Sequence, residues 1–483
     1  MTGIVSVGVY IPRMRMERAA IARAHAWMSP RAGAPQGFRS FPSWDEDAIT
    51  MAVEASRRVA ANPEAVHAFY LASTTLPFAD LQNSAIVTDA LRLPRRITAI
   101  DIAGSRRCAT SALITALKSQ DAAIVVASDA PAGKPASSQE LAFGAGAAAV
   151  RIGRQDVIAV CLASESRSDF FPDSFRASNE QFDYSWEERW IRDQGYLRLV
   201  PECAAAALQA AGVEPAAVAH FIMPAPQVGV AAAVAKRLGV SPQACAPSQS
   251  ETTGFAGAAA PFLSLAEVLE RAEPEQVVLL LAFGQGVDAL VLRTTPLLAE
   301  RRARIGFTKA VDDRIDDSSY LRMLSFQGSI ELEWGMRAEK EVKTALTEQY
   351  RSLPQLGAFN AGKCGKCGTI QFPQLSYCVN PTCNAPASGF TNVSLVDEPA
   401  RVFTFTADWL SYHAAPPLYV GFVQFANGAR VLMEIVDVGP NGLESGLPLK
   451  MVYRIKDHDK LRDYKRYFWK ATPVTVAPQR RQQ

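Results

Sequence analysis

Four cysteines lie close together in the segment CGKCGTIQFPQLSYCVNPTC: Cys364, Cys367, Cys378 and Cys383. The first pair is spaced C-x2-C and the second C-x4-C, with an Asn-Pro turn that can close the wider pair. Two thiolate pairs separated by a short hairpin can converge on one tetrahedral ion, and four sulfur ligands favour zinc. A redox dithiol and ordinary core cysteines are the alternatives. Because four thiolates leave no open coordination position, the pattern predicts a structural zinc rather than a catalytic one.

A fifth cysteine, Cys108, lies in ITAIDIAGSRRCATSALITALKS, which is typical of a buried strand, a tight turn and a small-residue helix. A thiol in the first turn of a helix is a candidate nucleophile, since backbone N–H groups and the helix dipole favour the thiolate. No histidine is placed to activate it: His220 precedes a strand and should lie at the opposite end, and the others occur in unrelated segments. A small buried thiol between helices is the alternative.

Arg106 and Arg107 directly precede this cysteine. A guanidinium at a buried helix start is costly unless paired, because it meets the positive end of the helix dipole. Arg106 therefore either pairs with a carboxylate, of which Asp101 is the nearest obvious one in sequence, or binds an anionic ligand.

Basic and aromatic residues interleave near the C-terminus in RIKDHDKLRDYKRYFWK. On a small barrel such a strip could bind single-stranded nucleic acid. Three aspartates dilute the charge, however, and the last strand of a barrel needs aromatic core residues in any case. A solvated face, and a contact with a phosphate or a partner domain, are the alternatives.

Short apolar runs alternate with Ala-rich helical stretches from residue 1 to about 295, as in AHFIMPAP followed by AAAVAKRLG. This alternation predicts an α/β domain with a largely parallel, covered sheet. LAFGAGAAAV at 141–150 returns as LAFGQGVDAL at 281–290, which suggests two related halves, 1–155 and 156–295.

The rest of the chain reads as three smaller parts. Residues 296–355 are predicted to form a charged linker and a docking helix at about 331–353, whose apolar residues recur at i+4 spacing. Residues 356–388 hold the clustered cysteines. Short strands broken by Asn-Gly turns over 389–475 predict a small antiparallel β-barrel. The helix stripe consists of Trp334, Ala338, Val342, Leu346 and Tyr350.

Composition sets limits on partners and compartment. The chain has 483 residues, with 50 Lys and Arg against 48 Asp and Glu, too balanced to make nucleic acid or an anionic membrane its main partner. The N-terminus lacks the pattern of a signal peptide, and no apolar run approaches about 18 residues. Scattered single thiols suit a reducing compartment, so a cytoplasmic protein is expected.

Several stretches resemble the thiolase superfamily, specifically the 3-hydroxy-3-methylglutaryl-CoA synthase and ketoacyl synthase III branch: GIVSVGVYIPR, DIAGSRRCATSAL, HFIMPAPQ with AKRLGV, and TTGFAGAAAPFLSLAEVLERAEPEQVVLLLAFGQG. Residues from about 330 onward resemble the zinc-ribbon plus OB-fold module found beside thiolase-like proteins that act on acyl-CoA. This resemblance implies a rubredoxin-like zinc ribbon over 356–388 and an OB-fold barrel over 389–475. The resemblance implies a duplicated, five-layered α/β fold, a homodimer, and a tunnel that carries the pantetheine arm of CoA to the nucleophile. Acyl-CoA is therefore the expected ligand.

The resemblance also shows where this chain departs from the family's chemistry. The family's nucleophilic cysteine corresponds to Arg106, two residues before Cys108. Two helical residues differ by about 200° in direction, so Cys108 should face a neighbouring helix or sheet unless the turn is longer than in relatives. Thr74 takes the place of the Glu acid/base, Pro224 that of the His, and Thr253 that of the oxyanion-hole Asn.

Three functions are compatible with these residues. The first is an enzyme that makes or breaks a carbon–carbon bond next to a CoA thioester without an acyl-cysteine, by aldol or retro-aldol chemistry. Arg106 would then face a substrate carboxylate, a thioester enolate or a CoA phosphate. The second is a catalytically silent subunit that binds acyl-CoA or scaffolds an active partner, such as another thiolase-like enzyme. The third, a nucleic-acid-binding barrel, explains only the tail. The catalytic candidates are Thr74, Ser105, Arg106, Thr253 and, if the turn is longer, Cys108.

Overall fold

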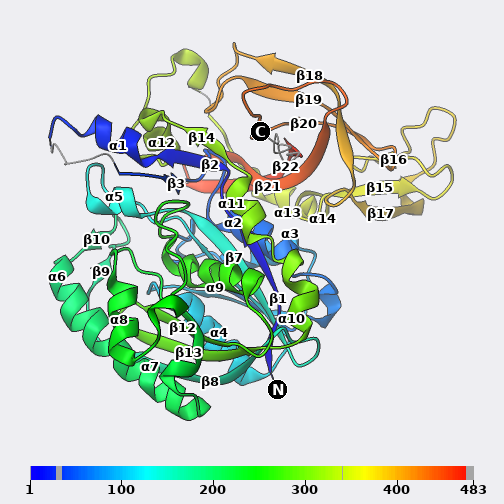
Figure 1. Cartoon of the computed structure of the whole chain (residues 1–483). Helices are drawn as coiled ribbons and strands as arrows, with labels where there is room; N and C mark the ends of the chain where they lie inside the picture. Colours follow the sequence, from blue (N-terminus) through cyan, green and yellow to red (C-terminus); the bar gives the residue numbers. More distant parts are fainter. Residues whose placement is uncertain (1, 29–34, 340, 475–483) are drawn as a thin grey trace, which may run out of the picture. The chain divides into compact units, whose positions relative to one another are not determined.

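The computed structural model describes residues 2–28, 35–339 and 341–474. The chain divides into two compact units (Figure 1). Unit 1 comprises Met1–Ser43, Asp47–Thr88 and Leu93–Gln327, and unit 2 comprises Trp44–Glu46, Asp89–Arg92 and Gly328–Gln483.

A nine-stranded mixed sheet forms the centre of unit 1, in the order β11-β12-β13-β8-β1-β7-β6-β4-β5. Its strands β4, β6 and β12 are buried along their whole length, which explains why they read as continuous apolar runs. The strands are β1 (Gly3–Tyr10), β4 (Ala68–Ala72), β5 (Thr98–Ile102), β6 (Ala123–Asp129), β7 (Gly146–Gly153), β8 (Ala159–Ser168), β11 (Val218–Ile222), β12 (Val277–Phe283) and β13 (Gly286–Thr294).

The prediction of a largely parallel sheet is wrong. β4 pairs in parallel with β5 and β6, and β11 with β12, but the other neighbours are antiparallel. The short Gly284-Gln285 turn between β12 and β13 explains part of this, because a two-residue turn can join only antiparallel strands. Gln285 has a φ of +53° there.

The two halves predicted from the repeated Gly-x-Gly stretch are visible in the strand order. Outward from the β1–β8 pair, one half runs β1-β7-β6-β4 and the other β8-β13-β12-β11, with β5 as an additional edge strand of the first. Gly146 and Gly286, the second glycines of the two repeats, begin the corresponding strands β7 and β13.

Helices complete a five-layered arrangement. α4 (Cys108–Ser119) and α9 (Ala260–Arg271) both contact strands of the two halves, so they form the middle layer. α2 (Ala48–Arg57) packs on β1, β6 and β7, and α7 (Leu197–Ala211) packs on β8, β12 and β13, with α8 (Val230–Leu238) against it. The duplicated, layered α/β fold implied by the resemblance is confirmed.

The segment 296–327 is not the predicted linker but part of unit 1. Its Leu298, Ile305 and Phe307 are buried in the core, and its strand β14 pairs in parallel with β2. Charged residues lie between these buried residues and explain why the sequence resembles a linker.

The smaller elements of unit 1 are α1 (Arg18–Ala24), α3 (Asn83–Ala90), α5 (Ser138–Ala142), α6 (Glu188–Trp190), α10 (Leu297–Arg301), α11 (Phe307–Asp312), α12 (Tyr320–Phe326), β2 (Met14–Glu17), β3 (Phe38–Ser40), β9 (Ser174–Phe175), β10 (Tyr184–Ser185) and β14 (Ile315–Asp317).

Unit 2 contains a three-stranded sheet, β16-β15-β17, and a five-stranded antiparallel sheet, β20-β19-β18-β21-β22. A bridge between Ile435 and Ala471 joins the end of β20 to β22, so the larger sheet curves back toward closure. The predicted Asn-Gly turn lies between β19 and β20, where Gly428 has a φ of +93°. The strands are β15 (Asn360–Cys364), β16 (Ile370–Gln371), β17 (Phe390–Ser394), β18 (Ala400–Asp408), β19 (Leu418–Phe425), β20 (Arg430–Glu434), β21 (Pro448–Asp459) and β22 (Tyr464–Pro473).

The predicted docking helix at 331–353 is wrong. Its described residues form only a single 3-10 turn and the short helices α13 (Leu346–Arg351) and α14 (Leu353–Leu356). Gly335, with a φ of +71°, interrupts the i+4 pattern, and Tyr350 of the expected stripe is 79% exposed. Among the described residues of the whole chain, no helix combines the length and apolar character needed to cross a membrane.

Candidate active site and cysteine cluster

The carboxyl ends of β4 and β5 meet the β12–β13 turn at one end of the sheet of unit 1. Thr74 follows β4, Ser105 and Arg106 follow β5, and Gly284 lies in the turn; all four line a cavity of about 190 Å³. Ligands bind preferentially where the carboxyl ends of α/β strands open. The structure therefore brings three of the predicted catalytic candidates to one cavity.

Arg106 is nearly buried, with 11% of its side chain exposed. Its Nη2 lies 3.2 Å from Oδ2 of Asp183, and its guanidinium carbon lies over the rings of Phe143 and Phe255, 5.2 and 5.8 Å from their centroids. Asp183 also pairs with Arg176, at 3.1 Å. One carboxylate is thus shared by two guanidiniums that both line the cavity.

Asp101 is not the partner of Arg106, contrary to the expectation from sequence proximity. Its carboxylate oxygens accept hydrogen bonds from the backbone amides of Asn83 and Ser84, both at 2.7 Å. These amides belong to the first turn of α3, whose N–H groups have no partner within the helix. The carboxylate is therefore used to cap that helix.

Ser105 is held by the backbone around it. Its hydroxyl donates to the carbonyl oxygen of Gly284 at 2.6 Å and accepts from the amide of Arg107 at 3.2 Å. A Cβ at Gly284 would lie 3.0 Å from the Ser105 oxygen, so glycine permits this close approach. Arg107 points elsewhere and pairs with the fully buried Asp288 at 2.9 Å.

Thr74 contacts an acidic residue that the sequence reasoning missed. Its hydroxyl donates to Oδ2 of Asp129 at 2.7 Å, and its amide donates to Oδ1 at 2.9 Å. Asp129 is the last residue of β6 and has no exposed surface. An ionisable residue that ends an otherwise apolar strand, as in AIVVASD, was the signal that could have identified it.

The other two candidates, Cys108 and Thr253, are not among the residues that line the cavities around Arg106. Cys108 is the first residue of α4, is 3% exposed and packs in the main core of unit 1. Burial and the nearby Asp129 raise the pKa of its thiol well above the ordinary value. Thr253 is 1% exposed, and its hydroxyl lies 3.4 Å from the carbonyl oxygen of Gly254. This position gives no support to an oxyanion-hole role for Thr253.

Two larger cavities continue from the small one. A cavity of about 770 Å³ shares Arg106 and Asp173 with it, and a third, of about 460 Å³, shares Gln227 and Val228 with the second. Pro224, which takes the place of the family's histidine, lines the third cavity and brings no ionisable group to it. Volumes of about 300–1,000 Å³ suit small-molecule ligands.

A π-helical turn, Ile191–Tyr196, forms part of the wall of the 770 Å³ cavity. It lies between α6 and α7, and π-helical turns are frequent at functional sites. Gly195 is required inside this turn, because a Cβ there would lie 2.8 Å from the ring of Phe283.

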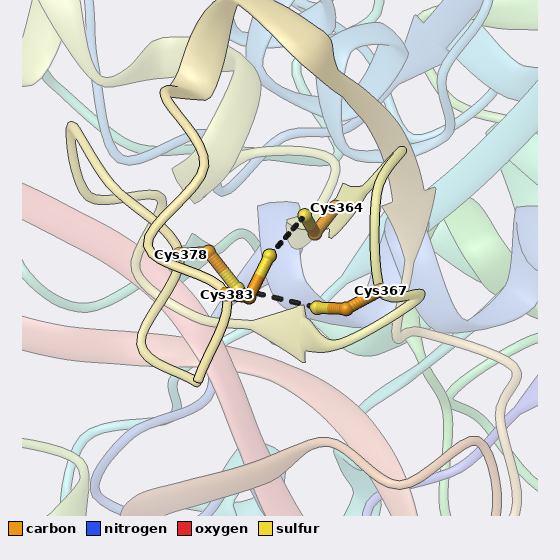
Figure 2. Close-up of side chains that lie close together, drawn as sticks. All are labelled: Cys364, Cys367, Cys378 and Cys383. Carbon is orange, nitrogen blue, oxygen red and sulfur yellow. Dashed lines mark hydrogen bonds between the residues drawn. The ribbon is translucent and has the colours of Figure 1, made fainter. Parts of the chain in front are cut away.

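The four clustered cysteines of unit 2 converge as their spacing predicts (Figure 2). Their Sγ atoms all lie within 4.8 Å of one another, with 3.8 Å between Cys364 and Cys383 and 3.5 Å between Cys367 and Cys378. Zn–S bonds of about 2.3 Å in a tetrahedron place the sulfurs about 3.8 Å apart. The donor set and its geometry therefore fit zinc.

The basic strip of the C-terminal hairpin is not simply a solvated face. Arg454 and Lys470 are each 1% exposed, and carboxylates surround both. Lys470 Nζ lies 2.9 Å from Oδ2 of Asp45 and 3.0 Å from Oε2 of Glu434, and Arg454 Nη2 lies 2.8 Å from Oδ2 of Asp437. These two cations are thus committed to buried ion pairs, and a solvated face is the wrong interpretation for them.

Taken together, the duplicated halves, the five layers and the cavities at the carboxyl ends of the strands define a thiolase-like protein. Residues 208–294 match the family described as the C-terminal part of 3-oxoacyl-[acyl-carrier-protein] synthase III. The hydroxymethylglutaryl-CoA synthase of Archaeoglobus fulgidus is 31% identical over 313 residues, 61% of this chain and 90% of the relative. That of Pyrobaculum aerophilum is 27% identical over 335 residues, 66% of this chain and 94% of the relative. The chain belongs to the hydroxymethylglutaryl-CoA synthase family.

Solved structures agree on the fold. An HMG-CoA synthase complexed with CoA superposes with a TM-score of 0.58 at 17% identity, covering 71% of this chain and 95% of that one. The 3-oxoacyl-(acyl carrier protein) synthase III of Pseudomonas aeruginosa gives 0.54 at 21% identity, covering 61% and 98%. Because the relatives are synthases, the comparisons give no support to the alternative of a catalytically silent subunit.

Proposed function

We propose that this protein binds acyl-CoA and makes or breaks a carbon–carbon bond next to the CoA thioester without an acyl-cysteine intermediate. The observation that carries the proposal is the separation of two neighbouring residues. Arg106, at the position of the family's nucleophile, lines the cavity, whereas Cys108 is buried in the core with a raised pKa. The chain keeps the fold of the family, but the thiol of Cys108, the nearest group that could form an acyl-enzyme, does not line the cavity.

The residues around the small cavity would take different roles in such a reaction. A C–C bond next to a thioester breaks through an enolate, whose negative oxygen needs fixed positive charge or hydrogen-bond donors. Arg106 supplies a guanidinium held in place by Asp183 and two aromatic rings. Thr74, which follows the neighbouring strand β4, brings its hydroxyl oxygen to the same cavity, and Ser105 holds the β12–β13 turn by donating to the carbonyl oxygen of Gly284.

The larger cavities are the proposed path of the CoA arm. The structural relative complexed with CoA has the same fold, and here the 770 and 460 Å³ cavities lead away from Arg106. Arg18 lines both of these cavities and offers a cation for a phosphate group.

Unit 2 is proposed to carry one structural zinc held by four thiolates, inside a zinc-ribbon and OB-fold module. With all four positions filled by sulfur, the ion would stabilise the loops between β15 and β17 rather than take part in the reaction. We further propose that the protein acts in the cytoplasm, as a homodimer or together with another acyl-CoA enzyme.

The test is a panel of 3-hydroxyacyl-CoA and 3-oxoacyl-CoA compounds, with release of acetyl-CoA, propionyl-CoA or free CoA followed by liquid chromatography. The proposal expects turnover of at least one compound, by the protein alone or with a partner enzyme, and equal turnover by Cys108→Ala. Absence of turnover under both conditions contradicts the enzyme assignment.

A further inference from the structure

Asp129 is a carboxylate enclosed entirely by hydrogen-bond donors. Oδ2 accepts from the Thr74 hydroxyl at 2.7 Å and from the amide of Ala258 at 2.8 Å. Oδ1 accepts from the Thr75 hydroxyl at 2.8 Å, the Thr74 amide at 2.9 Å and the Ser73 hydroxyl at 3.1 Å. Five donors thus converge on one side chain at the end of β6.

This carboxylate has no cation beside it within the described part of the chain. Burial of a carboxylate without an opposite charge is costly even when hydrogen bonds surround it. Burial raises the pKa of Asp129, and the hydrogen bonds from Ala258, Thr74 and Thr75 oppose that rise. A group with a raised pKa next to a cavity is a candidate for proton transfer.

Thr74 connects Asp129 to the cavity. It lines the same 190 Å³ space as Arg106, and its hydroxyl proton is directed at Asp129. That leaves the lone pairs of Thr74 Oγ1 for a group inside the cavity. Its neighbour Thr75 also donates to Asp129, but its oxygen accepts from the amide of Ala130 at 3.0 Å, and it is absent from the cavity wall.

We propose that Thr74 and Asp129 form a two-step proton relay, with Thr74 touching the substrate and Asp129 as the positioning residue and proton store behind it. The inference rests on the proposed function and assigns the acid/base role that the family's glutamate cannot fill here. Of the two threonines whose hydroxyls donate to the carboxylate, Thr74 lines the cavity and Thr75 does not.

For cleavage of a 3-hydroxyacyl-CoA, the relay works as follows. The 3-hydroxyl proton passes to Thr74 Oγ1 while the Thr74 proton passes to Oδ2 of Asp129. The freed electron pair forms the new C=O bond, the bond between carbons 2 and 3 breaks, and its electrons enter the thioester enolate. Asp129 then returns its proton through Thr74 to carbon 2. The products are a carbonyl compound and a shorter acyl-CoA, with no change in oxidation state overall.

The test compares three variants of the full chain on the most active thioester of the panel. Thr74→Val should lower kcat about 100-fold or more, the usual contribution of a general acid/base, with little change in thioester Kd measured by calorimetry. Thr74→Ser should retain most of the activity. Thr75→Val, which removes an equivalent hydrogen bond to the same carboxylate, should lower kcat less than tenfold.

Asp129→Asn adds a readout that a purely structural role would not move. The wild-type rate should rise with pH as Asp129 loses its proton, and Asp129→Asn should abolish that limb of the pH profile. Equal losses in Thr74→Val and Thr75→Val, or full activity in Thr74→Val, overturn the relay while the proposed function stands. If the wild type neither binds nor converts any thioester, the proposed function fails and the relay fails with it.

Discussion

The start of α4 in unit 1 and the cysteine cluster of unit 2 place sulfur in opposite surroundings. Cys108 is a single thiol packed against apolar side chains, with a raised pKa and no sulfur partner. In the cluster, four sulfurs point toward one another within 4.8 Å (Figure 2). A cysteine's chemistry follows from what surrounds it: the surroundings of Cys108 favour a packing role, and those of the cluster fit a bound metal ion.

Removal of zinc should have the largest effect. Cys378→Ser, or treatment with a strong chelator, should release the metal and lower the free energy of unfolding of unit 2 by several kcal/mol, because binding of structural zinc is coupled to folding. Elemental mass spectrometry measures the zinc content, and thermal unfolding monitored by circular dichroism measures the loss of stability. Cys245→Ser, a cysteine outside the cluster, is the matched control and should keep one zinc per chain. Wild-type protein with far less than one zinc contradicts the assignment.

Arg106→Ala should lower kcat by about 100-fold, the usual effect of removing one group that stabilises an oxyanion. The kcat of Arg106→Lys should fall less than that of Arg106→Ala, because the positive charge remains. Asp183→Asn breaks the same ion pair without removing the guanidinium, so its kcat should stay within a few-fold of the wild-type value. Similar kcat values for Arg106→Ala and the wild type would leave Arg106 with a structural role only.

The thiols should differ in reactivity. In native protein at pH 8, iodoacetamide should leave Cys108 unmodified, because the side chain is 3% exposed and burial raises its pKa. After zinc is stripped, the four cluster thiols should all be alkylated. Peptide mass spectrometry measures the labelling at each site. Rapid labelling of Cys108 in the native state would contradict its burial in the core.

Cys108→Ala should have the smallest effect. Loss of one buried sulfur lowers the free energy of unfolding by about 1 kcal/mol, as core truncations of this size do. Urea unfolding followed by fluorescence checks this value. A loss of several kcal/mol would indicate a role in the core beyond simple packing.

Local spacing was enough to predict the cluster and the strand-turn-helix around Cys108. Both depend on residues within about twenty positions, where turn and helix geometry fix the directions of side chains. The two halves were also predicted, because the repeated Gly-x-Gly marks the same strand start, Gly146 and Gly286, in each.

Contacts across long stretches of sequence could not be predicted. Arg106 pairs with a carboxylate 77 residues away, and Thr74 donates to one 55 residues away. The end of an apolar strand marks Asp129 as unusual, but no local pattern tells which residue it contacts. The prediction of a helix at 331–353 was wrong for a different reason, because here a local signal was present but misleading. A periodic pattern was present, but Gly335 interrupts it, and the described residues of this range form no buried face that would stabilise a helix.

Intact-protein mass spectrometry during turnover can decide whether an acyl group is ever attached to this protein. Wild type and Cys108→Ala are mixed with the active acyl-CoA, quenched within the first turnovers and weighed, while product release is followed in parallel. We expect equal turnover and no acyl adduct on either protein. An acyl adduct that maps to Cys108, together with loss of turnover in Cys108→Ala, would contradict this expectation.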